Sequence, residues 1–244
     1  MAASNPIQIV PLHGDALAAP VSAAHLTYRG GPLLQAAQVF VFFWGTAWEG
    51  PQAALVQQIN QFFDFILTSP LLDQLAEYSV AGTSIGHGSR TGSVILSTDP
   101  PASIADSDIT SLIQQEITND SAVPQPTANT LYHVFLPPGV TITLDGGMSC
   151  SNFCGYHSDI NGRIFYAVVP YPDCSECTGP VSVMDALTST TSHELCEAIT
   201  DPVPGQGWYD DRNGEIGDIC AWKTRRLGSF SVQLEWSNKA GQCI

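Results

Sequence analysis

Positive charge is scarce in this sequence. Its 244 residues include 23 Asp and Glu but only 8 Lys and Arg, which gives a formal net charge of -15. No cluster of basic side chains is available to neutralise phosphate groups, so we expect neither a nucleic acid nor an anionic membrane as a partner. The acidic balance is compatible with cation binding, but it also serves simply to keep a protein in solution.

Long apolar segments and several familiar motifs are missing as well. No apolar run approaches the roughly 20 residues of a membrane span, and the N-terminal segment lacks the basic start and continuous apolar core of a signal peptide. There is no Gly-rich phosphate-binding loop and no Ser-centred nucleophile elbow. These absences disfavour a membrane protein, a nucleotide-binding enzyme and a serine hydrolase.

Four of the seven cysteines form two close pairs, Cys150 with Cys154 and Cys174 with Cys177. The spacing of the first pair does not match the CxxC ends of a structural zinc cage. The second pair does not lie at the strand-to-helix turn of a thioredoxin-like redox site. We therefore expect disulfide bonds, and the sequence leaves the pairing among these four cysteines open.

The remaining cysteines lie near the C-terminus. Cys220 and Cys243 are predicted to close the last segment of the chain, whereas Cys196 lies within a predicted helix and is expected to be a buried free thiol. Because disulfides persist in oxidising compartments, we expect a secreted or extracellular protein, although the sequence shows no signal peptide.

Strand-like and helix-like segments alternate along the chain. Runs rich in β-branched and aromatic residues predict strands at 39–44, 131–136, 164–169 and 230–236. Apolar residues at helical spacing predict helices at 51–67, 107–117 and 181–200. This alternation predicts an α/β fold with a mixed sheet flanked by helices.

The domain organisation follows from the same pattern. Residues 1–25 are predicted to be a flexible N-terminal arm, and residues 26–244 are predicted to be a single α/β domain, because no linker or repeat interrupts them. The segment that carries the first cysteine pair, up to about Gly162, is predicted to be a loop held by disulfides.

A variant of the zinc-peptidase motif lies in the last predicted helix. The sequence SHELCEAITDP contains His193, Glu194 and Glu197, which match HExxH except that glutamate replaces the second histidine. On a helix, His193 and Glu197 lie about 40° apart, as two ligands of one ion must. Zinc accepts carboxylate as well as imidazole ligands, and Glu194 occupies the place of the general base. The alternative is an exposed polar helix face without a function.

A zinc hydrolase needs a further protein ligand from outside the helix. The acidic loop at 208–220 offers Asp218 and, as a second choice, Glu215, while Asp201 at the end of the helix is a third candidate. The same loop spaces oxygen-bearing side chains at Asp211, Asn213 and Glu215, a weak resemblance to calcium loops. The predicted cofactor is therefore Zn²⁺, with Ca²⁺ as an alternative or additional ion.

One more histidine is a candidate for the site. His157 follows Cys154 in the predicted disulfide-held loop, which would fix its position. We predict a catalytic role for it beside Glu194, in stabilising an oxyanion, and it is also a possible ligand. The alternative is an ordinary surface histidine.

Several segments in order along the chain resemble one known family. They are YRGGPLL at 28–34, the aromatic strand ending at Gly45, CxxxCGxH at 150–157, FYA at 165–167 and EIGDIC at 215–220. In these segments the chain resembles the phosphate-induced protein family that includes plant EXORDIUM proteins, and more closely its microbial branch, which carries an HExxE motif. The resemblance implies a secreted, disulfide-bearing protein, and its plant members are associated with the cell wall.

Two functions are compatible with these observations. The first is a secreted zinc-dependent metallohydrolase, a zincin-like peptidase that acts on a peptide or protein substrate. The second is a non-catalytic extracellular or cell-wall-associated binding protein, in which Zn²⁺ or Ca²⁺ has a structural role and the partner is a cell-wall component.

Overall fold

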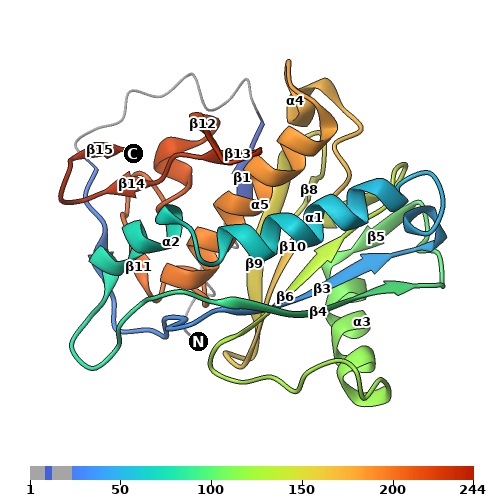
Figure 1. The fold of residues 1–244 in the computed structure, drawn as a ribbon, viewed down its shortest axis with the longest axis horizontal. Helices are drawn as coiled ribbons and strands as arrows, with labels where there is room; N and C mark the ends of the chain where they lie inside the picture. The colour runs from blue at the N-terminus through green and yellow to red at the C-terminus, as the bar shows by residue number, and fades with distance from the viewer. Residues whose placement is uncertain (1–8, 13–23) are drawn as a thin grey trace.

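The computed structural model describes residues 9–12 and 24–244. Its centre is a mixed sheet of six strands in the order β1-β9-β10-β6-β3-β4 (Figure 1). The four strands from β10 to β4 are parallel to one another, whereas β9 is antiparallel to both of its neighbours. The bounds in this order are Ile9–Pro11, Phe153–Ile160, Ile164–Val169, Thr130–Phe135, Gln38–Trp44 and Ser89–Leu96.

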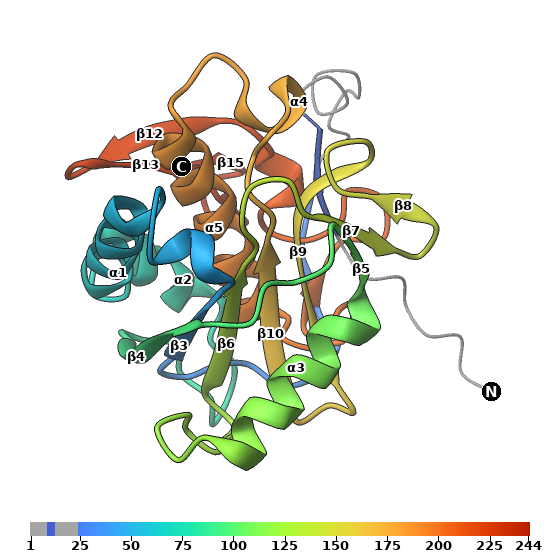
Figure 2. The same ribbon diagram turned by 90° about the vertical axis from the view of Figure 1, so that its right-hand side faces the viewer.

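Helices cover both faces of this sheet (Figure 2). Helices α1 (Ala53–Ile66), α2 (Pro70–Leu75) and α5 (Val183–Thr200) pack on one face, and α3 (Asp106–Asn119) packs on the other. Successive side chains of β3 alternate between the two resulting cores, because neighbouring residues of a strand point to opposite faces. The run of buried apolar residues in β3 is therefore explained by a sheet covered on both sides.

Shorter elements connect these layers and form the C-terminal region. They are β2 (Thr27–Tyr28), η1 (Thr46–Trp48), η2 (Ala76–Tyr78), β5 (Ser103–Ala105), β7 (Thr141–Leu144), β8 (Gly147–Met148), α4 (Ser175–Thr178), β11 (Trp208–Tyr209), η3 (Asp218–Cys220), β12 (Thr224–Leu227), β13 (Phe230–Gln233), β14 (Trp236–Ser237) and β15 (Gln242–Cys243). Of these, β13 lies against α5, on the side away from the sheet.

The predicted mixed α/β fold is confirmed, and so are the disulfides. Cys150 bonds to Cys174, Cys154 to Cys177 and Cys220 to Cys243, which settles the pairing that the sequence leaves open. Cys196 is a buried free thiol, as expected. Among the helices that the structure describes, none has the length and apolar character to cross a membrane.

Two parts of the prediction are wrong in detail. The segment 153–160, expected to belong to a loop, is strand β9, because it pairs with β10 on one side and with β1 on the other. Strand β1 itself falls within the N-terminal arm predicted at 1–25, so residues 9–11 belong to the sheet. Residues 1–8 and 13–23 of that arm lie outside the described residues.

Candidate metal centre

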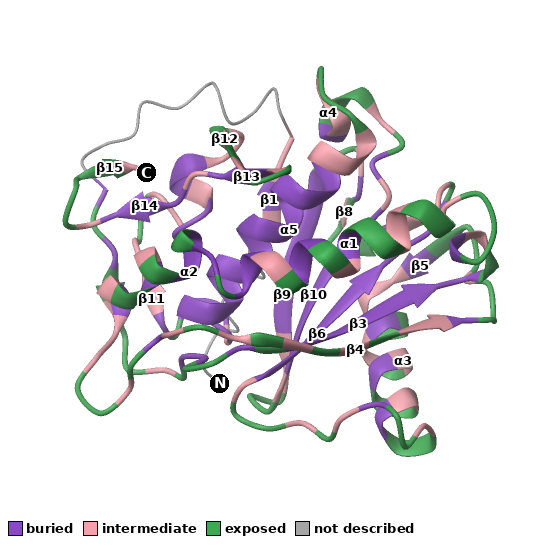
Figure 3. Cartoon of the chain, viewed as in Figure 1, coloured by how far each residue is buried: buried purple, intermediate pink, exposed green. Residues whose placement is uncertain are grey.

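Helix α5 carries the HExxE motif through the middle of the protein. Its N-terminus is capped by Ser182, whose hydroxyl accepts a hydrogen bond from the Asp185 N–H at 3.1 Å. Every residue from 186 to 200 is buried, because the sheet covers one side of the helix and β13 covers another (Figure 3). The motif residues therefore do not form an exposed polar face, which removes the simplest non-functional explanation of the motif.

The first group of possible ligands joins α5 to the acidic loop. His193 Nε2 lies 2.9 Å from Glu197 Oε1 and 3.8 Å from Asp218 Oδ1. The Asp218 N–H donates to the same Glu197 oxygen at 3.1 Å, which fixes the start of η3 beside the helix. One donor atom from each of these three residues lies within 4.8 Å of the others. The helix motif and the predicted third ligand, Asp218, are thus brought together.

The other side of the His193 ring contacts Gln233 on β13. The Gln233 amide donates to His193 Nδ1 and to the Gly217 carbonyl, both at 2.9 Å. If Nδ1 is the acceptor, a neutral ring carries its proton on Nε2, which lies 2.9 Å from Glu197 Oε1. The Gln233 amide oxygen accepts the Trp222 N–H at 3.0 Å, so the amide is held at both ends. If a cation bound Nε2 and the ring proton moved to Nδ1, the amide would have to give up these bonds for its oxygen to accept that proton.

Gly217 is required for this close packing. A Cβ atom at this position would lie 2.9 Å from Glu197 Oε1 and 2.9 Å from His193 Cγ. Any side chain would displace two of the candidate ligands. The glycine in the sequence EIGDIC is therefore part of the architecture of the centre.

A second group of possible ligands forms around His157, which lies on β9 and not on a loop. Its Nδ1 atom is 3.3 Å from Glu194 Oε2 and 3.4 Å from Glu197 Oε2. Its Nε2 atom donates to the Asp201 carbonyl at 3.1 Å and lies 3.6 Å from Glu215 Oε1. One donor atom each from His157, Glu197 and Glu215 lies within 4.8 Å of the others.

Asp201, the third predicted ligand, is not a member of either three-residue group, although its carboxyl contacts that of Glu215. Its carboxylate accepts hydrogen bonds from the N–H groups of Gly205 at 2.6 Å, Gln206 at 3.0 Å and Gly207 at 2.5 Å. These bonds close the turn that follows α5. Asp201 therefore contributes through its main-chain carbonyl, which orients His157.

The predicted calcium loop does not assemble either. The Asp211 side chain is 91% exposed and pairs with Arg29, whereas Glu215 is fully buried and faces His157. Asn213 is turned towards Asp210, whose carboxylate accepts its side-chain amide at 3.0 Å. The three oxygen-bearing side chains therefore point in different directions.

Many buried polar atoms at the centre make no hydrogen bond. Within the described residues, these atoms are His193 Nε2, Glu194 Oε1, Glu197 Oε2 and both carboxylate oxygens of Glu215. Such atoms are rare in folded proteins, and a bound ion, a water molecule or a catalytic role can account for them. The set of imidazole and carboxylate donors suits a zinc ion. The residues present thus fit a cation.

Burial and mutual repulsion shift the ionisation of these acids. Burial raises the pKa of Glu194 to about 7 and that of Asp218 to about 8. Burial also opposes the ionised form of Glu197, but His193 and His157 outweigh it and lower the pKa of this carboxyl to about 2. Glu197 is therefore the carboxylate that stays charged at neutral pH, while Glu194 titrates in the range expected of a general base.

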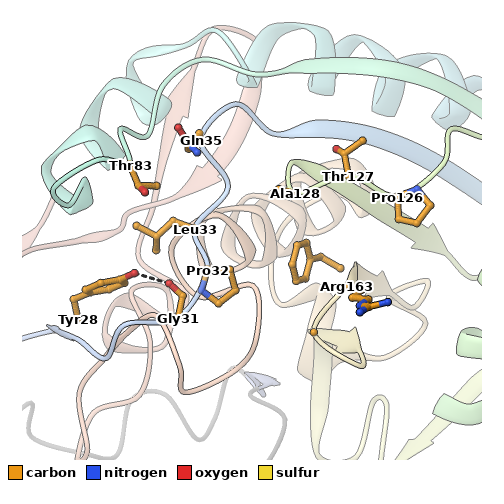
Figure 4. Close-up of a pocket in the computed structure, with 12 residues that line it drawn as sticks. Tyr28, Gly31, Pro32, Leu33, Gln35, Thr83, Pro126, Thr127, Ala128 and Arg163 are labelled. Carbon is orange, nitrogen blue, oxygen red and sulfur yellow. Dashed lines mark hydrogen bonds between the residues drawn. The ribbon is translucent and has the colours of Figure 1, made fainter.

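Two other features of the structure stay separate from this centre. A cluster of Cys150, Cys174 and Cys177 has metal-ligating side chains, but all three are in disulfides and offer no thiolate. A cavity of about 660 Å³ lies between Tyr28 and Arg163 (Figure 4). None of the candidate ligands lines it.

Comparisons with known proteins add little to this geometry. No protein-family model matches the chain, and no curated protein matches it. One solved structure, titled "Structure of a chaperone-substrate complex", is 14% identical over 66% of this chain with a TM-score of 0.28. This chain spans only 23% of the length of that chain. A likeness at this level says nothing about function, so the functional argument depends on the metal centre itself.

Proposed function

We propose that this protein is a zinc-dependent hydrolase of the HExxE type that cleaves peptide bonds. One observation carries the proposal. Glu194 and Glu197, on successive turns of α5, are both fully buried, and each has a carboxylate oxygen without a hydrogen-bond partner among the described residues. Both face His157, and Glu197 also faces His193. This arrangement fits a metal ligand, Glu197, next to a general base, Glu194. It fits a structural hydrogen-bond network less well, because in such a network the buried carboxylate oxygens would all accept hydrogen bonds.

The residues of α5 and η3 have distinct roles in this proposal. His193, Glu197 and Asp218 would hold the ion. A zinc ion bound there supplies a Lewis acid, which polarises a substrate carbonyl and favours the ionisation of water. Two acid ligands make the centre less electrophilic than one built from three histidines, so we expect slow or specialised catalysis.

Glu194 and His157 complete the proposed reaction. Glu194 accepts the proton of the attacking water, which is the role of the glutamate in an HExxH helix. Burial disfavours the protonated form of His157, but Glu215, Glu194 and Glu197 outweigh it and raise its pKa well above the usual value. A protonated His157 beside Glu194 can donate to the oxyanion that develops on the substrate.

The proposed setting is extracellular. The three disulfides favour an oxidising compartment. The resemblance to the microbial branch of the EXORDIUM-like family supports the same setting and the use of an HExxE motif. It leaves open whether the partner is a peptide or protein substrate or a cell-wall component.

A structural metal is the second candidate function, and burial favours it. His193, Glu194, Glu197 and Glu215 are all fully buried, and the Asp218 side chain is 15% exposed. Closed sites are typical of structural zinc, whereas catalytic sites keep a position open. In this alternative, Zn²⁺ or Ca²⁺ fastens the acidic loop to α5 in a binding protein with a cell-wall partner.

The experiment that separates these functions compares the wild type with Glu194→Gln. Metal content is measured by elemental analysis and proteolysis is measured on casein. The proposal expects stoichiometric zinc in both proteins and proteolysis in the wild type alone. Zinc in both proteins with no proteolysis in either, and a fall in unfolding temperature on chelation, supports the structural metal. Equal proteolysis in both proteins would sink the assigned role of Glu194.

A further inference from the structure

Glu197 divides its two carboxylate oxygens between the two groups of possible ligands. Oε1 lies 2.9 Å from His193 Nε2 and accepts the Asp218 N–H. Oε2 points the other way, 3.4 Å from His157 Nδ1, and accepts no hydrogen bond from a described residue. A carboxylate placed in this way can bind one cation through each oxygen.

Glu215 is the main unsatisfied group on the His157 side. It is fully buried, its carboxyl lies against that of Asp201, and no N–H group of the described residues donates to either of its oxygens. The carboxylate of Asp218 differs from that of Glu215, because its Oδ2 accepts the Glu215 N–H at 3.0 Å and its side chain is partly exposed to solvent. A cation at His193 and Asp218 alone would therefore leave Glu215 uncompensated.

His157 is oriented as a metal ligand would be. Its Nε2–H donates to the Asp201 carbonyl at 3.1 Å, an interaction that commonly fixes the ring of a ligating histidine. This leaves Nδ1 directed at Glu194 Oε2 and Glu197 Oε2. The Asp201 carbonyl is held in place in turn, because the Asp201 carboxylate is fixed by the turn at 205–207.

The charges of the centre also call for more than one cation. Four carboxyl groups, those of Glu194, Glu197, Glu215 and Asp218, meet there, and the Asp201 carboxyl lies against Glu215. Within the described residues the ion-pair partners of the four acids are His157 and His193, and no Lys or Arg pairs with them. If bound cations displaced the protons of these four carboxyl groups, two divalent cations would balance their charge, whereas one would balance half of it. Glu235 is buried too, but it contacts Cys196 and belongs to neither group.

From these contacts we infer that Glu197 bridges two divalent cations, one held with His193 and Asp218 and the other with His157 and Glu215. The inference rests on the proposed function for the first cation and adds a second site to it. His157 is then a ligand, and the second cation takes over the electrostatic role proposed for its ring. Paired cations of this kind clamp the attacking and leaving oxygens in many hydrolases, including aminopeptidases.

The test counts metal ions in isosteric variants. Wild type, Glu215→Gln and Asp218→Asn are saturated with Zn²⁺, passed through a desalting column and measured for zinc per chain. We expect two ions in the wild type and one in each variant. Asp211→Asn is the matched control, since it removes an exposed acid from the same loop, and it is expected to keep two.

One zinc per wild-type chain, unchanged by Glu215→Gln, would overturn the inference and would mean that Glu215 is neutralised by a proton. If Glu215→Gln does not fold, the wild type is titrated with Co²⁺ and the visible absorption band is followed. Saturation at two equivalents supports the inference, and saturation at one equivalent contradicts it. The zinc count tests the second site, whereas the proposed function is tested separately by the proteolysis of casein in the wild type and Glu194→Gln, whatever the number of zinc ions bound.

Discussion

His157 Nδ1 lies 3.3 Å from Glu194 Oε2, although the two residues are 37 positions apart in the chain, and both side chains are fully buried. The contact joins strand β9 to helix α5 across the interior of the protein. It is possible because Gly155, two residues before His157 on the same strand, lets the helix approach. A Cβ atom on Gly155 would lie 2.6 Å from Thr190 Cγ2 and 3.0 Å from Glu194 Oε1.

The substitution Gly155→Ala should therefore push α5 away from β9. We expect a loss of about 1 to 3 kcal/mol in the free energy of unfolding, the usual cost of overpacking, and weaker zinc binding. Denaturant titration and zinc competition with a chromophoric chelator measure the two effects. Gly86→Ala is the control, because a Cβ there meets nothing closer than Gln35 O at 3.9 Å. Equal stability of Gly155→Ala and the wild type would contradict the tight approach.

Gln233 should control the affinity of the centre for zinc through the His193 ring. Its amide contacts Nδ1 at 2.9 Å, and no other side chain among the described residues makes a hydrogen bond with that atom. We expect Gln233→Leu to weaken zinc binding by about 10- to 100-fold, the usual effect of losing the group that orients a ligating histidine.

Gln233→Glu tests the direction of that effect. A carboxylate at this position accepts the Nδ1 proton without having to turn over, so zinc affinity should exceed that of Gln233→Leu by at least about tenfold. Isothermal titration calorimetry gives both affinities. Equal affinities in the two variants would show that Gln233 only fills space beside the ring.

Asp106 makes a pH-dependent contribution to stability on the opposite face of the sheet. Its carboxylate accepts hydrogen bonds from Tyr156 at 2.7 Å and Tyr166 at 2.9 Å. Burial raises its pKa, the two hydroxyl groups oppose the shift, and Asp145 adds to it. Because the folded pKa is raised, this contribution is present below the unfolded pKa of about 3.9 and is lost as the pH rises through the folded value.

The variant Asp106→Asn keeps a hydrogen-bond acceptor for both tyrosines but does not titrate. We expect the difference in unfolding free energy, wild type minus variant, to fall as the pH rises from about 4 to about 7. Denaturant titrations at several pH values measure this difference. The acids of the metal centre are the same in both proteins, so their contributions to the pH dependence of stability cancel. A difference that rises over this range would mean that the pKa of Asp106 is lowered.

Local patterns explain which parts of the fold and the site could be predicted from the sequence. Strands β3, β6 and β10 and helices α1, α3 and α5 were predictable, because their apolar side chains repeat at the spacing of the element. His193, Glu194 and Glu197 were recognisable because the motif depends on one helical turn. Asp218 and Glu215 were recognisable as acids close to that helix in the sequence.

The remaining features depend on contacts between distant segments. Strand β9 reads CGYHSD at its centre, a polar and Gly-containing sequence, and it is a strand because β1 and β10 pair with it. His157 therefore lies on a strand, in a segment that was predicted to be a loop. Gln233 gave no signal, since its contact with His193 spans 40 positions. The hydrogen bonds that the Asp201 carboxylate accepts from three backbone N–H groups of the following turn were equally hidden.

The disulfide between Cys220 and Cys243 should affect the metal centre as well as stability. Cys220 ends η3, the short helix that begins with Asp218, so the bond anchors the segment that carries a candidate ligand. We expect the double variant Cys220→Ser with Cys243→Ser to lose about 2 to 4 kcal/mol of unfolding free energy, as is typical for a disulfide. Zinc affinity should fall as well, because the Asp218 segment loses its anchor.

Removal of the Cys150–Cys174 bond is the matched control. It spans 24 positions against 23 for Cys220–Cys243, so its effect on the entropy of the unfolded chain is nearly the same. Its cysteines lie outside both groups of carboxylate and histidine ligands, so stability should fall by a similar amount while zinc affinity stays close to that of the wild type. Equal losses of zinc affinity in the two double variants would instead mean that general destabilisation, and not the anchoring of η3, governs the centre.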